Sequence, residues 1–158
     1  TQGEADLGIL SGRPDLPGLQ TEFFFKDTIV LAAGTRHPAA QKRSIRPEQL
    51  RAHDFVLFHP GSAVRQAVDL QMRSLRLEWK PRITMEVRSM ETAIRSIESG
   101  VGIGFISSLA LTRGMRRLAC AEMETDRDFF FCYRRRSRAT EEVIRMIRSV
   151  SARKTGAE

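Results

Sequence analysis

In the segment 88–111, apolar residues recur first with the spacing of a helix and then with the alternation of a strand. Ser89 can cap the helix, and Gly100 can end it in a left-handed turn. We therefore predict an amphipathic helix over residues 90–99. Its apolar residues recur at i, i+3, i+4 and i+7, and they are Met90, Ala93, Ile94 and Ile97.

After Gly100 the apolar residues alternate with glycines, which predicts a strand with one face nearly free of side chains. Another backbone, a packed helix or a ligand can approach such a face closely. The glycines at 100, 102 and 104 could also suggest a phosphate loop. However, that fingerprint follows a strand and opens a helix. The order here is reversed, so we do not expect nucleotide binding.

Strands alternate with helices along the rest of the chain, which is typical of an α/β fold with a mostly parallel sheet. There are no repeats, low-complexity runs or Pro/Gly/Ser-rich linkers that would separate independent domains. We predict strands at 7–10, 28–33, 55–58, 83–87, 101–106 and 129–133, and helices at 47–52, 63–75, 90–99 and 141–151.

Several segments along the chain resemble, in their order, segments of the effector-binding domain of LysR-type transcriptional regulators. The order and spacing of the motifs make the resemblance specific, and it covers nearly the whole chain. One departure is Ser107, where the family often has a proline. Besides RSMETAIRSIESGVGIGFISSLAL (88–111), the motifs are EADLGILSG (4–12), DTIVLAAGTRHPAA (27–40), RPEQL (46–50), PGSAVRQAVDLQM (60–72) and RDFFFCYRRR (127–136).

The resemblance implies a two-lobed fold similar to type 2 periplasmic binding proteins, in which the chain crosses twice between lobes. Residues 25–134 would form a complete second lobe. Residues 1–24 and 135–158 would form only part of the first lobe. The chain starts with Thr1 in the middle of the domain. We therefore expect a fragment that lacks the first strand-helix pairs, a linker helix and a winged helix-turn-helix domain.

Composition is compatible with a cytoplasmic protein. No apolar run approaches the roughly 18 residues that a membrane span requires, and the N-terminal sequence lacks the pattern of a secretory leader. Cys120 and Cys132 are isolated in the sequence. They are not spaced as a metal-binding pair, and two cysteines are too few for a disulfide framework. We expect structural thiols in a reducing compartment.

Basic residues gather at the C-terminal end of the sequence. Between Arg134 and Lys154 there are eight basic residues and two acidic ones, Glu141 and Glu142. The two acids offset two of the eight positive charges, and the remaining six are most of the formal net charge of +7 of the whole chain. A phosphate-binding surface is one interpretation, but no aromatic residues interleave with the arginines to stack on bases. We favour a solvated helix face. The opposite, buried stripe of this helix is predicted to be Val143, Ile144, Ile147 and Val150.

The candidate binding site lies at two strand-to-helix junctions. Ser62 and Ser89 can each cap a helix that follows a strand, at the carboxyl edge of the sheet. Free amides and the positive end of a helix dipole favour an anion there. We expect a small, carboxylate-bearing ligand. The candidate effector-binding residues are Ser11, His59, Ser62, Arg88, Ser89 and Ser107.

Each of these residues also has a purely structural interpretation. In this alternative, Ser62 and Ser89 only cap their helices, which stabilises each helix by about 1 kcal/mol. Ser107 can pack without touching a ligand, and His59 can face solvent in its turn. Substitution of these residues changes ligand affinity if they bind the effector, and leaves it unchanged if their role is purely structural.

Catalysis finds little support in the sequence. His37, His53 and His59 lie in three different turns without i, i+4 spacing, so no metal site is expected. Ser62 lacks the flanking glycines of the G-x-S-x-G elbow. Glu141 and Glu142 are neighbours that point in different directions on a helix. We predict no cofactor and no enzymatic activity.

The sequence thus predicts a ligand-sensing regulatory domain. In the family that it resembles, a small metabolite binds between the lobes and changes how a tetramer grips promoter DNA through the N-terminal domains. The alternative is a periplasmic solute-binding protein of a transporter, and an enzyme on this fold comes third. The sequence upstream of Thr1 would discriminate, because a helix-turn-helix supports the regulator and a signal peptide supports the transporter component.

The resemblance also implies pairing of effector domains through the helix at 63–75. Its apolar stripe (Val64, Val68, Met72 and Leu75) is needed for the core of the lobe, and Arg65, Asp69, Gln71 and Arg73 are expected elsewhere on the surface. Ala67 and Leu70 are then the candidate interface residues. Without the first helix of the family interface, we expect the fragment to be monomeric or to associate through another contact.

Overall fold

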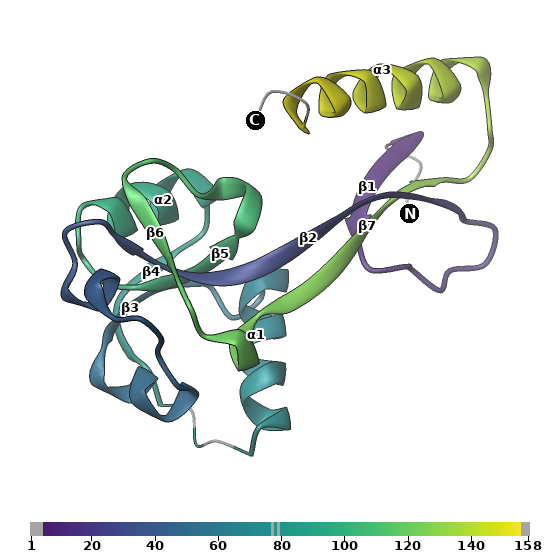
Figure 1. Cartoon of the computed structure of the whole chain (residues 1–158). Helices are drawn as coiled ribbons and strands as arrows, with labels where there is room; N and C mark the ends of the chain where they lie inside the picture. The colour runs from purple at the N-terminus through teal and green to yellow at the C-terminus, as the bar shows by residue number, and fades with distance from the viewer. Residues whose placement is uncertain (1–4, 77, 79, 156–158) are drawn as a thin grey trace. The chain divides into compact units, whose positions relative to one another are not determined.

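The chain divides into two compact units, which the strands β2 and β7 connect (Figure 1). The first unit contains residues up to 26 and from 127 onward, and the second unit contains residues 27–126. This computed structural model describes residues 5–76, 78 and 80–155, the last four without their side chains. The strands are β1 (Leu7–Ser11), β2 (Gln20–Gly34), β3 (Asp54–Phe58), β4 (Arg82–Val87), β5 (Gly104–Ser107), β6 (Met115–Leu118) and β7 (Thr125–Tyr133).

The helices of the second unit begin where sequence chemistry places them. Ser62 accepts a hydrogen bond from the amide of Arg65, and Ser89 accepts one from the amide of Thr92, so both serines cap their helices as predicted. The α-helices are α1 (Ala63–Ser74), α2 (Met90–Glu98) and α3 (Arg138–Thr155), and the 3-10 helices are η1 (Pro38–Gln41), η2 (Pro47–Ala52), η3 (Ser108–Ala110) and η4 (Ala121–Met123).

The core of the second unit lies between these helices and a mixed sheet. The predicted apolar stripes of α1 and α2 pack into it, with Val68 and Ile97 almost completely buried. Parallel pairing joins β3 to β4, and a parallel bridge joins Phe55 to Ile103 just before β5. Strands β5 and β6 pair antiparallel with β2. Burial of these helix stripes therefore fixes the second unit around its own core.

Two glycine positions explain the alternating strand after α2. Gly100 has a φ of 83°, so it ends α2 in the left-handed region, as predicted. A Cβ on Gly104 would lie 2.7 Å from the carbonyl oxygen of Val56 and 2.7 Å from Cδ1 of Ile97. The face without side chains is thus used by a neighbouring strand backbone and by a packed helix.

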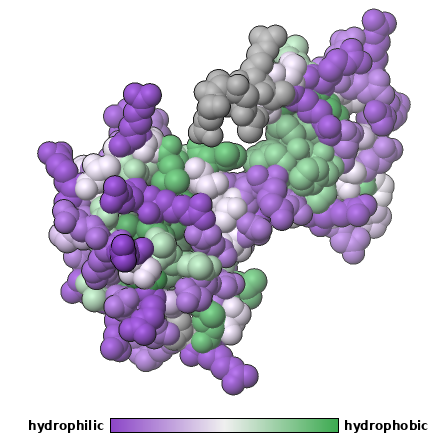
Figure 2. Space-filling view, viewed as in Figure 1, coloured by the Kyte–Doolittle hydropathy of each residue, from purple (hydrophilic) through white to green (hydrophobic). Residues whose placement is uncertain are grey.

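The first unit pairs β1 with β7 antiparallel and covers one face of them with α3. Ile144 is buried and Ile147 half-buried against Phe131 and Tyr133. The predicted stripe is too wide, because Val143 and Val150 are exposed. A single helix over β1, β7 and the first part of β2 offers a narrow contact surface. Hydrophobic surface is accordingly visible around these elements in Figure 2.

Several predicted strands differ from the structure. The predicted predominance of parallel pairing is not seen, because the described pairs β1/β7, β2/β5 and β2/β6 are antiparallel. The strand predicted at 28–33 is only the second half of β2, which starts eight residues earlier. The prediction missed β6, whose sequence MRRL carries a weak strand signal. The strand predicted at 101–106 begins at Gly104, apart from the bridge at Ile103.

The other boundaries shift by a few residues. The prediction for β7 began at 129 and that for α3 at 141, whereas the elements begin at Thr125 and Arg138. The helix predicted at 47–52 is the 3-10 helix η2. Within the described residues, no helix combines the length and the apolar character that crossing a bilayer demands.

Candidate functional site

The loops that follow β3, β4 and β5 lie at one edge of the sheet in the second unit. Phe58 pairs with Val87 at the ends of the parallel strands, and the amide of His59 donates a 2.9 Å hydrogen bond to the carbonyl oxygen of Val87. The parallel bridge before β5 gives that strand the same direction. The predicted residues His59, Ser62, Arg88, Ser89 and Ser107 therefore belong to neighbouring loops of one edge.

The loop before α1 is fixed by short hydrogen bonds of its own. Nδ1 of His59 accepts from the amide of Gly61 at 3.1 Å, and the amide of Ser62 donates to the carbonyl oxygen of His59 at 2.9 Å. Oγ of Ser62 accepts from the amide of Arg65 at 3.1 Å. Nδ1 of His59 must therefore be unprotonated in this arrangement. The imidazole Nε2 and the Ser62 hydroxyl hydrogen stay available as donors.

The loop before α2 presents an exposed arginine and a second capping serine. Oγ of Ser89 lies 3.2 Å from the amide of Thr92 and 2.8 Å from the Thr92 hydroxyl. Arg88 is exposed and forms no ion pair with any described residue. A guanidinium next to a helix N-terminus adds a full positive charge to the partial charge of the helix dipole. An anion would be stabilised at this position.

Ser107 is engaged in a buried cluster rather than open to the edge. Its hydroxyl donates to Oδ1 of Asp27 at 2.8 Å, and its Oγ accepts from the amide of Leu109 at 3.2 Å. The hydroxyl of Ser108 lies 3.2 Å from the same Asp27 oxygen. Ser107 is 8% exposed and Asp27 only 3%. Because its proton is committed to Asp27, Ser107 has no hydrogen to donate to an anion in this structure.

Asp27 and Arg65 were missed by the sequence analysis. Asp27 lies in the middle of β2 and directly precedes the mostly apolar segment TIVLAA, and an acid next to a buried strand segment is a recognisable signal. Arg65 was expected on the outer surface with Asp69, but its side chain is only 12% exposed. Its Nε donates to both carboxylate oxygens of Asp69, at 2.9 and 3.0 Å, and its Nη1 lies 3.5 Å from the carbonyl oxygen of Phe58. Arg65 thus supports the end of β3 behind the edge.

The remaining predicted residues have simpler surroundings. Ser11 is exposed at the end of β1 and belongs to the first unit. On α1, Leu70 is 61% exposed, whereas Ala67 is half-buried and packs against the core of the second unit. Their roles in ligand binding and pairing stay predictions.

Folding brings two of the three histidines together. The rings of His37 and His53 have centroids 6.3 Å apart, although they come from different turns. Burial lowers the pKa of both rings, and for His53 the nearby Lys42 lowers the pKa further. No group of three or more His, Cys, Asp or Glu side chains among the described residues could hold a metal ion.

The two cysteines are free and buried, as expected for structural thiols. Burial raises the pKa of the Cys120 thiol to about 11, and the neighbouring Glu122 raises it further. The pKa of Cys132 is also raised by burial. Neither thiol is therefore a reactive nucleophile at neutral pH.

Residues 1–153 match the LysR substrate binding domain family, and the chain belongs to this family. It is 32% identical over 107 residues to the RuBisCO operon transcriptional regulator of Acidithiobacillus ferrooxidans, covering 68% of this chain and 34% of the relative. It is 26% identical over 120 residues to a probable RuBisCO transcriptional regulator of Trichormus variabilis, with 72% and 35% covered. The chain thus spans about a third of the length of these relatives.

Solved structures show that the fold is that of LysR effector-binding domains. The regulatory domain of CcmR from Synechocystis PCC6803, in complex with 2-PG, matches with a TM-score of 0.78 and 24% identity, over 93% of this chain and 74% of that one. The effector-binding domain of QuiR in complex with shikimate matches with a TM-score of 0.67 and 20% identity, over 81% and 61%.

Proposed function

We propose that this chain is the effector-sensing domain of a LysR-type transcriptional regulator in the cytoplasm, and not an enzyme. Its effector is a small anionic metabolite, with a carboxylate as the favoured anionic group. Family membership and the regulators among its relatives support the regulatory role. The relatives give no support to the alternative of a transporter's solute-binding protein.

The observation that carries the anionic effector is the convergence of two helix N-termini at one sheet edge. The loops into α1 and α2 start side by side, because the Phe58 and Val87 ends of their strands are paired. Both helices retain amides in their first turns that have no acceptor within the helix. Arg88 adds an uncompensated charge. We assign ligand contact to His59, Ser62, Arg88 and Ser89, and to Ser107 a positioning role through Asp27.

Substitutions at the two caps separate anion binding from helix stability. Asn and Asp both cap helices about as well as Ser, so Ser62→Asn and Ser62→Asp should fold equally well. Only the aspartate places a negative charge where the anion binds. We expect Ser62→Asp and Ser89→Asp each to weaken effector binding at least about tenfold, and the asparagine variants to weaken it much less.

The measurement is isothermal titration calorimetry with a ligand found by a thermal-shift screen of small carboxylates and phosphates. Ser137→Asp is the matched control, because Ser137 accepts from the amide of Thr140 at the start of α3 in the first unit. It should leave affinity unchanged. Equal affinities for the Ser62→Asn and Ser62→Asp variants would contradict the proposal, and so would a screen in which no anion stabilises the protein.

In the whole regulator, we propose that promoter DNA is bound by another domain and that effector domains assemble within a tetramer. The exposed Leu70, with Ala67 beside it on α1, is the proposed pairing surface. Exposed apolar residues in the first unit, such as Leu10 and Phe23, support a first lobe that is incomplete in these 158 residues. Sedimentation of the whole regulator and of its Leu70→Glu variant tests the pairing, since loss of subunit association in the variant would confirm this surface.

A further inference from the structure

Two regions of the protein are rich in basic residues, and they differ in ion pairing. In the C-terminal cluster predicted from the sequence, Arg136 pairs with Glu141 at 2.7 Å and Arg138 with Glu142 at 3.1 Å. Arg148 reaches Glu22 of β2 at 2.7 Å. Both helix glutamates are therefore used to neutralise arginines. Of the other members, Arg135 and Arg145 form no ion pair with a described residue, and the side chains of Arg153 and Lys154 lie outside the described part of the chain.

The segment 35–53 of the second unit is different. It holds Arg36, Lys42, Arg43, Arg46 and Arg51 against a single acid, Glu48. All of these basic side chains are exposed. Among the described residues, Arg36, Arg43 and Arg51 have no ion-pair partner. We call Arg36, Lys42, Arg43 and Arg51 the basic loop face.

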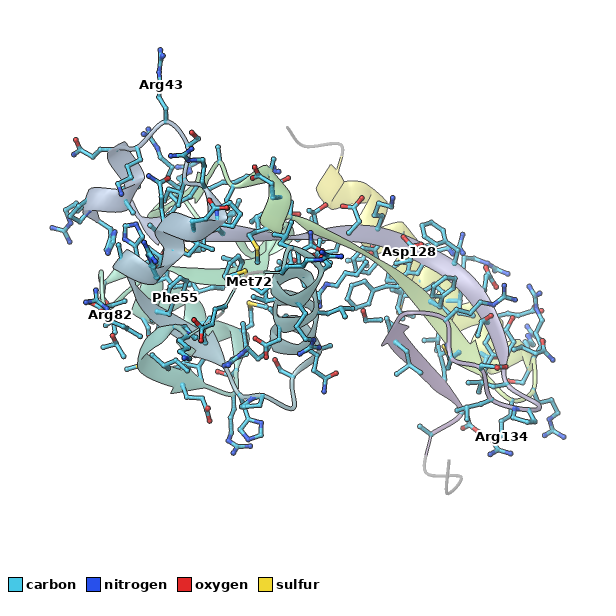
Figure 3. The ribbon with its side chains drawn as sticks, turned by 90° about the horizontal axis from the view of Figure 1, so that it is seen from below. Arg43, Phe55, Met72, Arg82, Asp128 and Arg134 are labelled. Carbon is cyan, nitrogen blue, oxygen red and sulfur yellow. The ribbon has the colours of Figure 1, made fainter. Side chains whose placement is uncertain are left out.

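Folding gathers this face from both ends of the segment. Nζ of Lys42 lies 3.4 Å from Nε2 of His53, and the rings of His37 and His53 are 6.3 Å apart. Arg36 directly precedes His37, Arg43 follows Lys42, and Arg51 lies two residues before His53. Since consecutive Cα atoms are about 3.8 Å apart, the four charges start from neighbouring points of the backbone. Figure 3 shows Arg43 directed away from the body of the unit.

Electrostatics at the centre of the face agree with uncompensated positive charge. After burial, the causes that lower the pKa of His53 are Lys42, His37 and Arg82, and the one opposing carboxylate is Asp54. Asp54 itself pairs with Arg82 at 3.1 Å. Asp54 is thus engaged by Arg82, and no described carboxylate forms an ion pair with Arg36, Arg43 or Arg51. Uncompensated positive charge of this kind favours an external polyanion.

The local structure favours the phosphate backbone of a duplex over bases. The segment carries no Phe, Tyr or Trp on which unstacked bases could stack. Its helices are the short 3-10 helices η1 and η2, and neither offers an α-helix to insert into a major groove. Exposed arginines at neighbouring points of the protein backbone suit the phosphate charges that repeat along a duplex.

We propose that the basic loop face is a second, sequence-independent contact to duplex DNA, which this effector domain makes in addition to the DNA-binding domain of the whole regulator. The proposal rests on the proposed function, because a promoter-bound regulator keeps its effector domains beside DNA. It assigns the contact to the second unit and not to the C-terminal cluster.

Fluorescence anisotropy of a short labelled duplex tests the proposal with the 158-residue chain. Arg36→Glu/Arg43→Glu/Arg51→Glu should lower affinity at least about tenfold and reduce the slope of log affinity against log salt by about 2.7, for three lost phosphate contacts. Arg135→Glu/Arg138→Glu/Arg145→Glu changes the charge equally in the C-terminal cluster. It should have a clearly smaller effect on both quantities.

Glutamine substitutions at residues 36, 43 and 51 provide a milder set that removes charge without reversing it. This glutamine triple should also lower the affinity for the duplex, by less than the glutamate triple, and its circular dichroism spectrum should match that of the wild type. Equal losses in the two glutamate triples would overturn the proposal, because they would show generic attraction. Tighter binding of polyglutamate or single-stranded DNA than of the duplex would also overturn it. Effector affinity in the same variants should not change, so failure here is distinguishable from failure of the proposed function.

Discussion

The two units differ in how completely their apolar residues are covered. In the second unit Phe55 of β3 and Ile97 of α2 are fully buried in one core cluster. In the first unit Phe23 is 51% exposed and Leu10 44%, although Phe131 is buried beneath α3. The difference teaches that the second unit holds a well-covered core of its own, while the first unit leaves large apolar side chains exposed.

The largest expected effect comes from removing matched phenylalanines. Phe55→Ala should destabilise the protein by about 3–5 kcal/mol, because it leaves a cavity in a buried core. Phe23→Ala removes a half-exposed ring that contacts Phe130 edge to face at 5.9 Å, so its cost should be well below that. Urea denaturation measures both. Similar losses for the two variants would break the comparison.

A smaller effect is expected from adding one methyl group. Gly104→Ala should destabilise by about 1–3 kcal/mol, because its Cβ would overlap the Val56 carbonyl oxygen and Ile97. Gly8→Ala in β1 is the control, since its Cβ would meet the Cys132 carbonyl oxygen at an ordinary 4.0 Å. That variant should be neutral or slightly stabilising in the same denaturation experiment. A neutral Gly104→Ala would show that β5 can move away from β3.

Acid should weaken the second unit selectively, because His37 and His53, whose pKa values are lowered, both lie in it. The pKa values of His37 and His53 are lowered from 6.5, chiefly by burial. The folded state therefore favours neutral rings. Their contribution to stability is complete above pH 6.5 and is lost as the pH falls through the lowered pKa values. His53→Gln should flatten the dependence of the melting temperature on pH below 6.5, and an unchanged dependence would contradict this assignment.

Thiol labelling should sharpen the comparison without changing stability. Both cysteines are buried with raised pKa values, so alkylation requires local opening. Cys132 belongs to the first unit and Cys120 to the second. We expect iodoacetamide to label Cys132 first, as followed by mass spectrometry of peptides. Earlier labelling of Cys120 would indicate that the second unit opens more readily.

The fold was predictable where periodicity and capping agree. The stripes of α1 and α2, their serine caps and the left-handed Gly100 follow from local chemistry. Strand direction was not predictable, because antiparallel pairing of β2 with β5 depends on contacts far apart in sequence. The predicted apolar stripe of α3 was too wide for a related reason. How much of an amphipathic face is covered depends on what packs against it.

The candidate site was predictable as a set of loops but not as a hydrogen-bond network. Strand ends and caps pointed to His59, Ser62, Arg88 and Ser89. The sequence could not show that Ser107 donates to Asp27, since the two residues are 80 positions apart. The same limit hid the proximity of His37 and His53. For basic residues, counting in the sequence singled out the C-terminal cluster, but it could not show that Arg136, Arg138 and Arg148 form ion pairs there.

The central claim is that a small anion binds at the N-termini of α1 and α2 in the second unit. Amide chemical shifts during titration with the ligand from the screen test this most directly. We predict that the amides of residues 62–65 and 89–92 shift together and saturate with the calorimetric affinity, while those at the start of α3 stay in place. Saturable shifts confined to the first unit, with residues 62–65 and 89–92 unchanged, would contradict the claim.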